Sequence, residues 1–245
     1  MGMCIVMKRQ MVSAACGIWI ALAGAGGAQT NAGQGTPKVV VELYTSQGCS
    51  SCPPADAFME KLAADPSVIA LALHVDYWDY IGWKDSFAHA AFTERQKAYA
   101  RAARSRTIYT PQMIVGGVDR VEGNAPMEVA DLVRRHLAVD PPVKLSLTRN
   151  GDRVVIRAEA DPPLSKMARV QLVRYLPSAV VSIERGENAG KTVTYHNIVT
   201  SWEVVTDWTG QSDLVFEAGA AGSEPVVVII QSEGPSEILA AARLD

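Results

Sequence analysis

Residues 38–56 read KVVVELYTSQGCSSCPPAD. The first seven, residues 38–44, form a near-continuous run of β-branched and other apolar residues, which predicts a strand buried on both faces of a sheet. Cys49 and Cys52 follow in a CxxC motif, and apolar residues at helical spacing begin shortly afterwards, within residues 58–63. A buried strand, a CxxC motif and a helix in this order decide the expected fold and direct the question of function to the two cysteines.

The first 28 residues have the pattern of a secretory signal peptide. Lys8 and Arg9 form a charged start, residues 11–25 are apolar and rich in small residues, and residues 26–28 offer a cleavage site. We therefore expect residues 1–28 to be removed and the protein to be periplasmic or secreted. An uncleaved membrane anchor is the alternative, but the apolar run is shorter than the ~20 residues that span a bilayer. No stable membrane insertion is expected after cleavage.

Export changes the meaning of the cysteines, because two thiols three positions apart form a disulfide in an oxidising compartment unless a partner reduces them. Cys49 and Cys52 are the only cysteines after residue 28. A staple that closes so short a loop adds little stability, since the entropic gain from a disulfide grows with loop length. The pair is better explained by thiol chemistry. At a helix start the dipole favours a thiolate, so Cys49 is the candidate nucleophile and Cys52 the resolving thiol.

Pro53 and Pro54 directly follow Cys52 and restrict where the helix begins. If Cys49 is the N-cap, the prolines fall at the fourth and fifth helical positions, where each removes an intrahelical hydrogen bond. If Ser51 is the N-cap, both prolines lie in the permissive first turn. The second arrangement costs less, and it moves Cys49 away from the helix end, which weakens activation by the dipole.

The chain changes character at residues 140–142, where Asp-Pro-Pro ends a helical pattern. Before this point the predicted order is β-α-β-α-β-β-α, and the elements after the first helix are a strand at 68–75, a helix at 85–104, a hairpin at 112–122 and a helix at 126–138. Beyond it, short strands alternate with turn signals and suggest a β-sandwich. These strands include residues 169–176, 180–184, 192–195 and 202–206. The expected divisions are a linker at 29–37, an α/β domain at 38–140 and a β-sandwich-like domain at 141–245.

The element order, the position of the CxxC motif and the Thr110-Pro111 dipeptide before the third strand together resemble the thioredoxin fold. The resemblance implies that Pro111 is a cis-proline that faces the CxxC motif and shapes a peptide groove. It also implies that Glu42, seven residues before Cys49, stands near the buried acid that many thioredoxins use as a proton acceptor.

More narrowly, the chain resembles the DUF1223 family of exported thioredoxin-like proteins. The matching segments are VELYTSQGCSSCPPAD (41–56), HVDYWDYIGWKD (74–85), YTPQMIVGG (109–117) and RGENAGKTVTYHN (185–197). They extend over most of the chain that follows the predicted signal peptide. The family has no established activity, so the resemblance implies thiol chemistry and nothing narrower.

Aromatic residues gather just after the second predicted strand. Tyr77, Trp78, Tyr80 and Trp83 are interpreted either as a packed cluster or as an aromatic wall beside the disulfide that accepts an extended peptide or an apolar ligand. Thr110 is a further candidate for substrate binding. In the preceding strand, His74 is better explained as a buried, hydrogen-bonded histidine than as a metal ligand. Zinc would need four ligands, and the sequence has neither a second CxxC nor an HxxxH motif.

The leading hypothesis is a thiol:disulfide oxidoreductase that acts on protein or peptide thiols with a separate redox partner. No cofactor and no metal are expected. Nucleic acid is disfavoured as a partner, because 23 basic and 26 acidic residues give a formal net charge of −3. Two alternatives stay open: a non-catalytic binding or assembly module with a structural disulfide, and a thiol pair that handles copper. The sequence does not decide whether the protein oxidises, reduces or isomerises its substrate.

Overall fold

The computed structural model describes residues 1–2 and 38–244. The predicted signal peptide with its cleavage site and the predicted linker fall largely on residues 3–37, outside the described residues. In chain order the elements are β1 (Val39–Thr45), α1 (Pro53–Ala64), β2 (Val68–His74), the 3-10 helix η1 (Asp79–Ile81), α2 (Ala90–Ala102), β3 (Gln112–Val115), β4 (Asp119–Glu122), α3 (Pro126–Leu137), β5 (Val143–Asn150), β6 (Arg153–Ala160), β7 (Ala168–Ser182), β8 (Thr192–Trp208), β9 (Leu214–Gly219), β10 (Val226–Ser232) and β11 (Ile238–Leu244).

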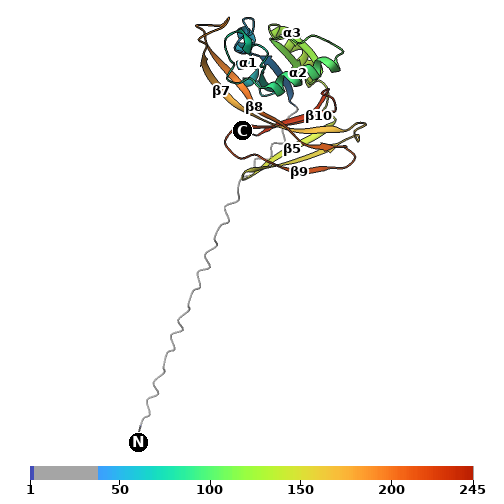
Figure 1. Cartoon of the computed structure of the whole chain (residues 1–245). Helices are drawn as coiled ribbons and strands as arrows, with labels where there is room; N and C mark the ends of the chain where they lie inside the picture. The colour runs from blue at the N-terminus through green and yellow to red at the C-terminus, as the bar shows by residue number, and fades with distance from the viewer. Residues whose placement is uncertain (3–37, 245) are drawn as a thin grey trace.

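Two sheets carry the fold. The larger has eight strands in the order β11-β10-β7-β8-β2-β1-β3-β4, and the smaller has three in the order β5-β6-β9. β1 pairs in parallel with β2 and antiparallel with β3, so the larger sheet is mixed. The expected α/β class is thereby confirmed. In Figure 1 the helices lie at one end of the molecule and β5 and β9 at the other, with β7, β8 and β10 between them.

The strands after residue 140 are divided between the two sheets. β7, β8, β10 and β11 extend the sheet of β1 and β2, and only β5, β6 and β9 form a sheet of their own. The two sheets face each other across one apolar cluster that includes Leu147 and Ile156 on one side and Val170 and Val228 on the other. A sandwich-like packing is therefore present, but it uses strands of the same sheet that carries β1, and the sheet crosses the expected boundary at residue 140.

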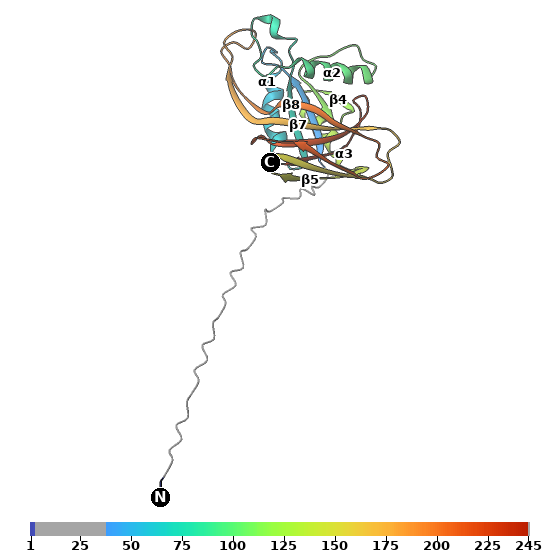
Figure 2. The same cartoon turned by 60° about the horizontal axis from the view of Figure 1, so that its bottom comes forward.

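β7 and β8 are longer than the sequence patterns predicted. Residues 169–176 and 180–184 were expected to form separate strands, but β7 runs through Pro177 without a break. The reason is that the pairing of β7 with β10 ends at Arg174, so Pro177 stands where β7 pairs with β8 alone. β8 likewise joins the patterns at 192–195 and 202–206 into one strand. In Figures 1 and 2 the far ends of both strands lie at the same end of the molecule as α1, and β8 packs against this helix.

β1 is buried along its full length, as the apolar run predicted. Its side chains alternate between two apolar clusters. Val41 and Leu43 pack with α1 and α3, whereas Val40 and Tyr44 pack with α2 and with β7, β8 and β10. This alternation decides which residues of β1 lie on the face covered by α1 and its CxxC motif.

α2 begins later than the expected start at residue 85. Its N-cap is His89, whose Nδ1 accepts a hydrogen bond from the backbone N–H of Ala91 at 3.1 Å. Asp85 instead folds back over the following turn, where its Oδ1 accepts from the backbone N–H of Phe87. Capping side chains of this kind compete with helical backbone pairing, and they delay the start of the helix. Within residues 1–2 and 38–244, no helix combines the length and the apolar character needed to cross a membrane.

Candidate functional site

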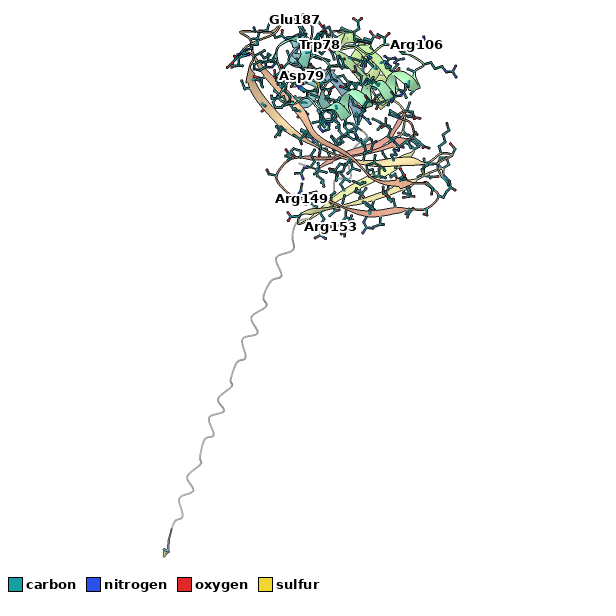
Figure 3. All side chains as sticks on the ribbon, viewed as in Figure 1. Trp78, Asp79, Arg106, Arg149, Arg153 and Glu187 are labelled. Carbon is teal, nitrogen blue, oxygen red and sulfur yellow. A yellow bond between two sulfur atoms is a disulfide. The ribbon has the colours of Figure 1, made fainter. Side chains whose placement is uncertain are left out.

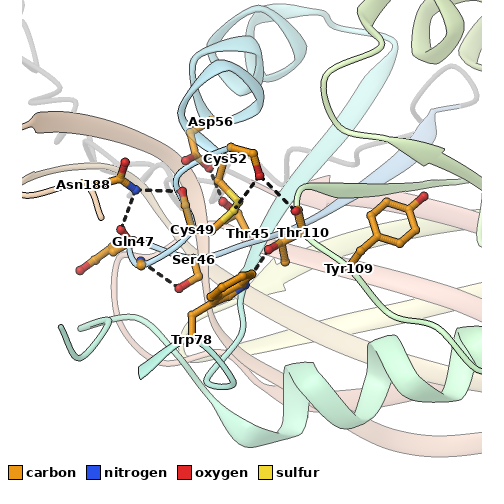
Figure 4. The surroundings of a disulfide bond; sticks show 12 residues. Thr45, Ser46, Gln47, Cys49, Cys52, Asp56, Trp78, Tyr109, Thr110 and Asn188 are labelled. Atoms are coloured by element: carbon orange, nitrogen blue, oxygen red, sulfur yellow. Dashed lines mark hydrogen bonds between the residues drawn. A yellow bond between two sulfur atoms is a disulfide. The ribbon is translucent and has the colours of Figure 1, made fainter. Parts of the chain in front are cut away.

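The two cysteines form a disulfide between the end of β1 and the start of α1. The Cα atoms of Cys49 and Cys52 are 5.4 Å apart, and the side chains are 1% and 0% exposed. The turn between them is closed by a hydrogen bond from the backbone N–H of Cys52 to the carbonyl of Cys49 at 3.2 Å. Figure 4 shows the disulfide enclosed by residues from several parts of the chain.

The helix begins so that both prolines lie in its first turn. Cys52 is the N-cap, and Pro53 and Pro54 occupy the first two helical positions, where the absence of a backbone N–H costs nothing. The cap is one residue later than the expected Ser51. Cys49 therefore lies three residues before the cap, one residue further from the helix than the less costly of the two expected arrangements places it.

Thr110 and Pro111 lie beside the disulfide, and the peptide bond between them is cis. Ser51 links the two segments, because its Oγ lies 3.4 Å from Cys49 Sγ and donates to the carbonyl of Thr110 at 3.4 Å. The indole Nε1 of Trp78 donates to Thr110 Oγ1 at 2.7 Å. The structure thus brings together Cys49, Thr110 and Trp78, three of the residues that the sequence singled out (Figure 4).

The other aromatic residues are directed to different partners. Tyr77 donates its hydroxyl to Gln96 Oε1 in α2, and burial raises the pKa of this tyrosine to about 12 although hydrogen bonds with Thr110 and Gln96 lower it. Trp83 donates Nε1 to Gln47 Oε1 at 2.8 Å, just before the CxxC motif. Trp78 and Trp83 therefore border the cysteine-bearing loop, while Tyr77 is anchored on α2.

Glu42 lies on the face of β1 that packs against α2, so it is on the opposite face from α1. Its two carboxylate oxygens accept hydrogen bonds from Arg95 Nε at 2.7 Å and Nη2 at 2.8 Å, and Tyr99 donates to Oε1 at 2.6 Å. The guanidinium of Arg95 also stacks on Trp202 at 3.8 Å from the ring centroid. Glu42 therefore has a bidentate ionic partner that ties α2 to β1 and to the strands after residue 140.

A different buried acid lies on the α1 face. Asp56 follows Cys52 by one helical turn, and its Oδ1 accepts a hydrogen bond of 2.7 Å from Thr45 Oγ1. Burial raises the pKa of Asp56 from its ordinary 3.8 to about 7; His74 and the Thr45 hydrogen bond lower it and Asp85 raises it. Sequence patterns did not single out Asp56. The signal was an acid at the i+4 position from Cys52, on the same face as Ala55 and Met59.

His74 and Asp85 form a second buried pair near Asp56. His74 Nδ1 lies 2.7 Å from Asp85 Oδ2, and that oxygen also accepts from the backbone N–H of Gln47 at 2.8 Å. Burial alone would raise the pKa of Asp85, but His74 and the backbone N–H donors outweigh it, and the net pKa is lowered. The expectation of a buried, hydrogen-bonded His74 is confirmed. Its Nε2 is buried without a hydrogen-bond partner.

A hairpin tip from the far end of the chain completes the surroundings of Cys49. Asn188, between β7 and β8, donates from Nδ2 to the carbonyl of Gln47 at 2.9 Å and to the carbonyl of Cys49 at 2.8 Å. In the sequence, residues 185–197 stood out only as one of the segments that resemble the DUF1223 family. Nothing local indicates that Asn188 lies beside a cysteine 139 positions earlier, because that contact depends on the length of β7 and β8.

The described residues, 1–2 and 38–244, contain no group of three or more His, Cys, Asp or Glu side chains arranged to hold a metal ion. Trp78, Asp79 and Glu187 mark the end of the molecule where the disulfide lies, and Arg149 and Arg153 mark the opposite end (Figure 3).

Comparisons with known proteins give one family and two similar structures. The crystal structure of protein AGR_C_4864 from Agrobacterium tumefaciens is 32% identical, with a TM-score of 0.74 over 86% of this chain and 95% of that one. HBP35 of Porphyromonas gingivalis is 12% identical, with a TM-score of 0.62 over 85% of this chain and 75% of that one, which is a likeness of fold alone. Among curated proteins none matches. The family described as "Protein of unknown function (DUF1223)" matches residues 40–231, and this chain therefore belongs to it.

Proposed function

We propose that the protein is an exported, thioredoxin-like thiol:disulfide oxidoreductase that acts on protein or peptide thiols through Cys49 and Cys52. The observation that carries the proposal is the position of Asp56, a buried acid with a pKa of about 7, one helical turn from Cys52. A structural disulfide needs no such group beneath it. Disulfide exchange does, because a thiol must lose its proton before it attacks.

The exchange proceeds in two reversible displacements. In the reduced protein the Cys49 thiolate attacks one sulfur of a partner disulfide, which forms a mixed disulfide and releases one partner thiolate. Cys52 then gives its proton to the Asp56 carboxylate and attacks the sulfur of Cys49. The Cys49–Cys52 disulfide forms, the bond to the partner breaks, and the second partner thiolate leaves and takes up a proton. Read in reverse, the same steps reduce the protein and oxidise its partner.

Asp56 suits the proton transfer because its pKa lies close to neutral pH. A group with a pKa near the working pH is present in both protonation states, and it can accept the proton of Cys52 in one direction and return it in the other. Thr45 holds the carboxylate in place through its hydroxyl, at 2.7 Å. In this proposal Asp56 takes the part that the thioredoxin resemblance gave to Glu42.

The proposed contact with substrate lies at Thr110, Pro111 and Trp78. Ser51 Oγ reaches both Cys49 Sγ and the Thr110 carbonyl, so a peptide that approaches Thr110 also approaches the sulfur of Cys49. Because Cys49 is 1% exposed, attack on a partner disulfide requires the surrounding loops to move apart.

A periplasmic or secreted location completes the proposal. The signal-peptide pattern of residues 1–28 supports it, and in such a compartment a separate redox partner is needed to return the pair to its working state. The net charge of −3 disfavours nucleic acid as a partner.

The test is reduction of insulin and reactivation of a scrambled disulfide protein, beside C49S and C52S variants and a control at the exposed Ser50, S50A. We expect activity in the wild type and in S50A, none in C49S, and a trapped mixed disulfide with C52S. A reduction potential well below about −300 mV together with no exchange contradicts the proposal. That result favours the second candidate, a binding or assembly module with a structural disulfide. The burial of both cysteines supports this candidate.

A further inference from the structure

Asn188 uses both N–H donors and the oxygen of its side-chain amide in hydrogen bonds. The two N–H bonds of Nδ2 are matched by the carbonyls of Gln47 and Cys49, at 2.9 and 2.8 Å. Its Oδ1 accepts from Lys191 Nζ at 2.8 Å, and the residue is 1% exposed. A primary amide has two donors and one acceptor oxygen, so this arrangement leaves neither donor free and fixes the orientation of the amide.

The tip that carries Asn188 is itself held in a defined shape. Ile183 and Lys191 close it by a backbone hydrogen bond of 2.9 Å, and Gly190 donates to the carbonyl of Ile183 at 2.8 Å. Gly186 has a φ of +78° and lies so close to Trp83 that an added Cβ would meet the tryptophan Cβ at 3.2 Å. The tip therefore packs on the aromatic loop that also borders the disulfide.

Three segments thus meet at the backbone before the disulfide. The carbonyl of Gln47 accepts a hydrogen bond from Asn188 and its side-chain oxygen accepts one from Trp83. Its backbone N–H donates to Asp85 Oδ2. The carbonyl of Cys49 accepts from Asn188 and from the backbone N–H of Cys52, the second of which closes the CxxC turn. Asn188 is therefore the direct link between the turn that contains the disulfide and the strands after residue 140.

Reduction changes what this turn must accommodate. Two bonded sulfur atoms become two separate atoms, which move apart to van der Waals distance, and the backbone of the turn relaxes to allow it. Hydrogen bonds that fix the carbonyls of Gln47 and Cys49 resist that relaxation. They favour the closed disulfide over the open dithiol, and Lys191 contributes because it keeps the amide of Asn188 turned toward the two carbonyls.

We propose that Asn188, oriented by Lys191, is a positioning residue through which the β7–β8 hairpin tip regulates the redox equilibrium of Cys49 and Cys52. The inference rests on the proposed function for its biological meaning. A partner that draws the tip away releases the Cys49 carbonyl and makes the disulfide easier to reduce. Figure 4 shows the two hydrogen bonds of Asn188 through which the tip would act on the thiol pair.

The experiment is the equilibrium of the purified protein with reduced and oxidised glutathione, for wild type, N188A, K191M and E187A. N188A is expected to lower the equilibrium constant for disulfide formation about tenfold, which is about 30 mV toward a more positive potential. K191M removes one hydrogen bond from an exposed lysine and is expected to shift the constant in the same direction by about threefold. E187A, at the exposed neighbour of Asn188, is the matched control and is expected to leave the constant unchanged.

Thermal unfolding of the oxidised and reduced forms separates positioning from a general loss of stability. A merely structural Asn188 would lower the midpoint of both forms equally and leave the potential unchanged, which overturns the proposal. If K191M shifts the equilibrium constant for disulfide formation in the opposite direction to N188A, the proposal that Lys191 orients Asn188 is contradicted. If N188A does not fold, K191M decides alone, and an unchanged constant there contradicts the proposal.

The glutathione equilibrium does not depend on catalysis, so the two proposals fail separately. A wild type that is inert toward insulin contradicts the oxidoreductase, while the shift in N188A still reports on the hairpin. A wild type that is active, with no shift in N188A, contradicts the regulation alone.

Discussion

The hydroxyl of Thr45 donates a hydrogen bond of 2.7 Å to Asp56 Oδ1, which joins the last residue of β1 to the first turn of α1 on the same face of the sheet as the disulfide. Asp56 is buried, and its ionisation is costly because no cation contacts it directly among the described residues. The free-energy cost of ionising Asp56 should therefore affect the free energy of unfolding and, in the proposed function, the rate of disulfide exchange.

The stability of the oxidised protein should depend on pH through Asp56. Its pKa is about 7 when folded and 3.8 by ordinary value, so the folded state binds more protons than the unfolded state between these limits. The stabilising contribution of protonated Asp56 to the free energy of unfolding is fully present below pH 4 and is lost as pH rises through 7. D56N removes it, and the stability of D56N relative to wild type should therefore rise by roughly 4 kcal/mol between pH 4 and pH 8. Urea unfolding at several pH values measures it, and a flat difference contradicts the raised pKa.

D56N should also slow the release of mixed disulfides. Without the carboxylate, Cys52 must lose its proton to water, and loss of a positioned base costs about 100-fold. The measurement is single-turnover decay of the Cys49 mixed disulfide in wild type and D56N. Initial attack by Cys49 is the internal control and should change little. Equal slowing of both steps would show that Asp56 maintains the shape of the CxxC loop, and it would contradict a specific transfer of the Cys52 proton to Asp56.

Asp85 should have the opposite pH signature. Its pKa is lowered in the folded protein by His74 and by backbone N–H donors despite burial, so its contribution is present above its ordinary value near 4 and is lost as pH falls through the lower folded pKa. D85N is expected to lose about 2 to 3 kcal/mol at pH 7, with a smaller loss at pH 3. Denaturant unfolding at both pH values tests the sign, and a loss that grows toward acid pH would refute it.

Glu42 is expected to matter for folding. E42Q leaves the buried guanidinium of Arg95 without its bidentate partner and should cost about 3 to 5 kcal/mol of stability. The control is E217Q, which breaks the exposed pair of Arg153 and Glu217 and should cost less than about 1 kcal/mol. Normal resolution of mixed disulfides by folded E42Q separates this role from proton transfer. A stable E42Q with slow resolution would return the proton acceptor to Glu42.

Gly117 tests the contact between the turn after β3 and the segment before β11. Its φ is +78°, and an added Cβ would overlap the backbone carbonyl of Ser236. G117A should therefore cost about 2 to 4 kcal/mol, the sum of backbone strain and overlap. G151A is the matched control, because Gly151 also has a positive φ, of +57°, but open space around it; it should cost about 1 kcal/mol. Chemical unfolding compares the two, and equal losses would rule out the overlap.

Much of the site follows from short-range patterns. The apolar run of residues 38–44 required a buried strand, and the sheet has one there. The pair Pro53-Pro54 favoured a helix start that places both rings in the first turn, and the helix begins in this way, with Cys52 as the N-cap instead of the expected Ser51. These features were predictable because the rules behind them involve neighbours within one turn or one strand.

The strands after residue 140 were harder to place. Their alternating pattern indicates a sheet with one apolar face but not which strand lies beside which, and β8 in fact pairs with β2. Pro177 indicates a break when read alone, yet it is tolerated in β7 because the pairing with β10 has already ended at Arg174. Whether a residue lies where its strand has one neighbour or two is decided by the assembled sheet, and the residues next to Pro177 do not reveal it.

The sequence by itself determined the disulfide-forming pair and the strand and helix around it. Tertiary structure alone decided which buried acid lies on the face of β1 that carries α1 and which distant residue bonds the carbonyl of Cys49. Glu42 and Asp56 are both buried, and the choice depends on which face of β1 receives α1. Asn188 reaches Cys49 from 139 positions away because β8 packs against α1, which places the tip between β7 and β8 beside the CxxC motif. Both outcomes result from long-range packing, which local propensity does not encode.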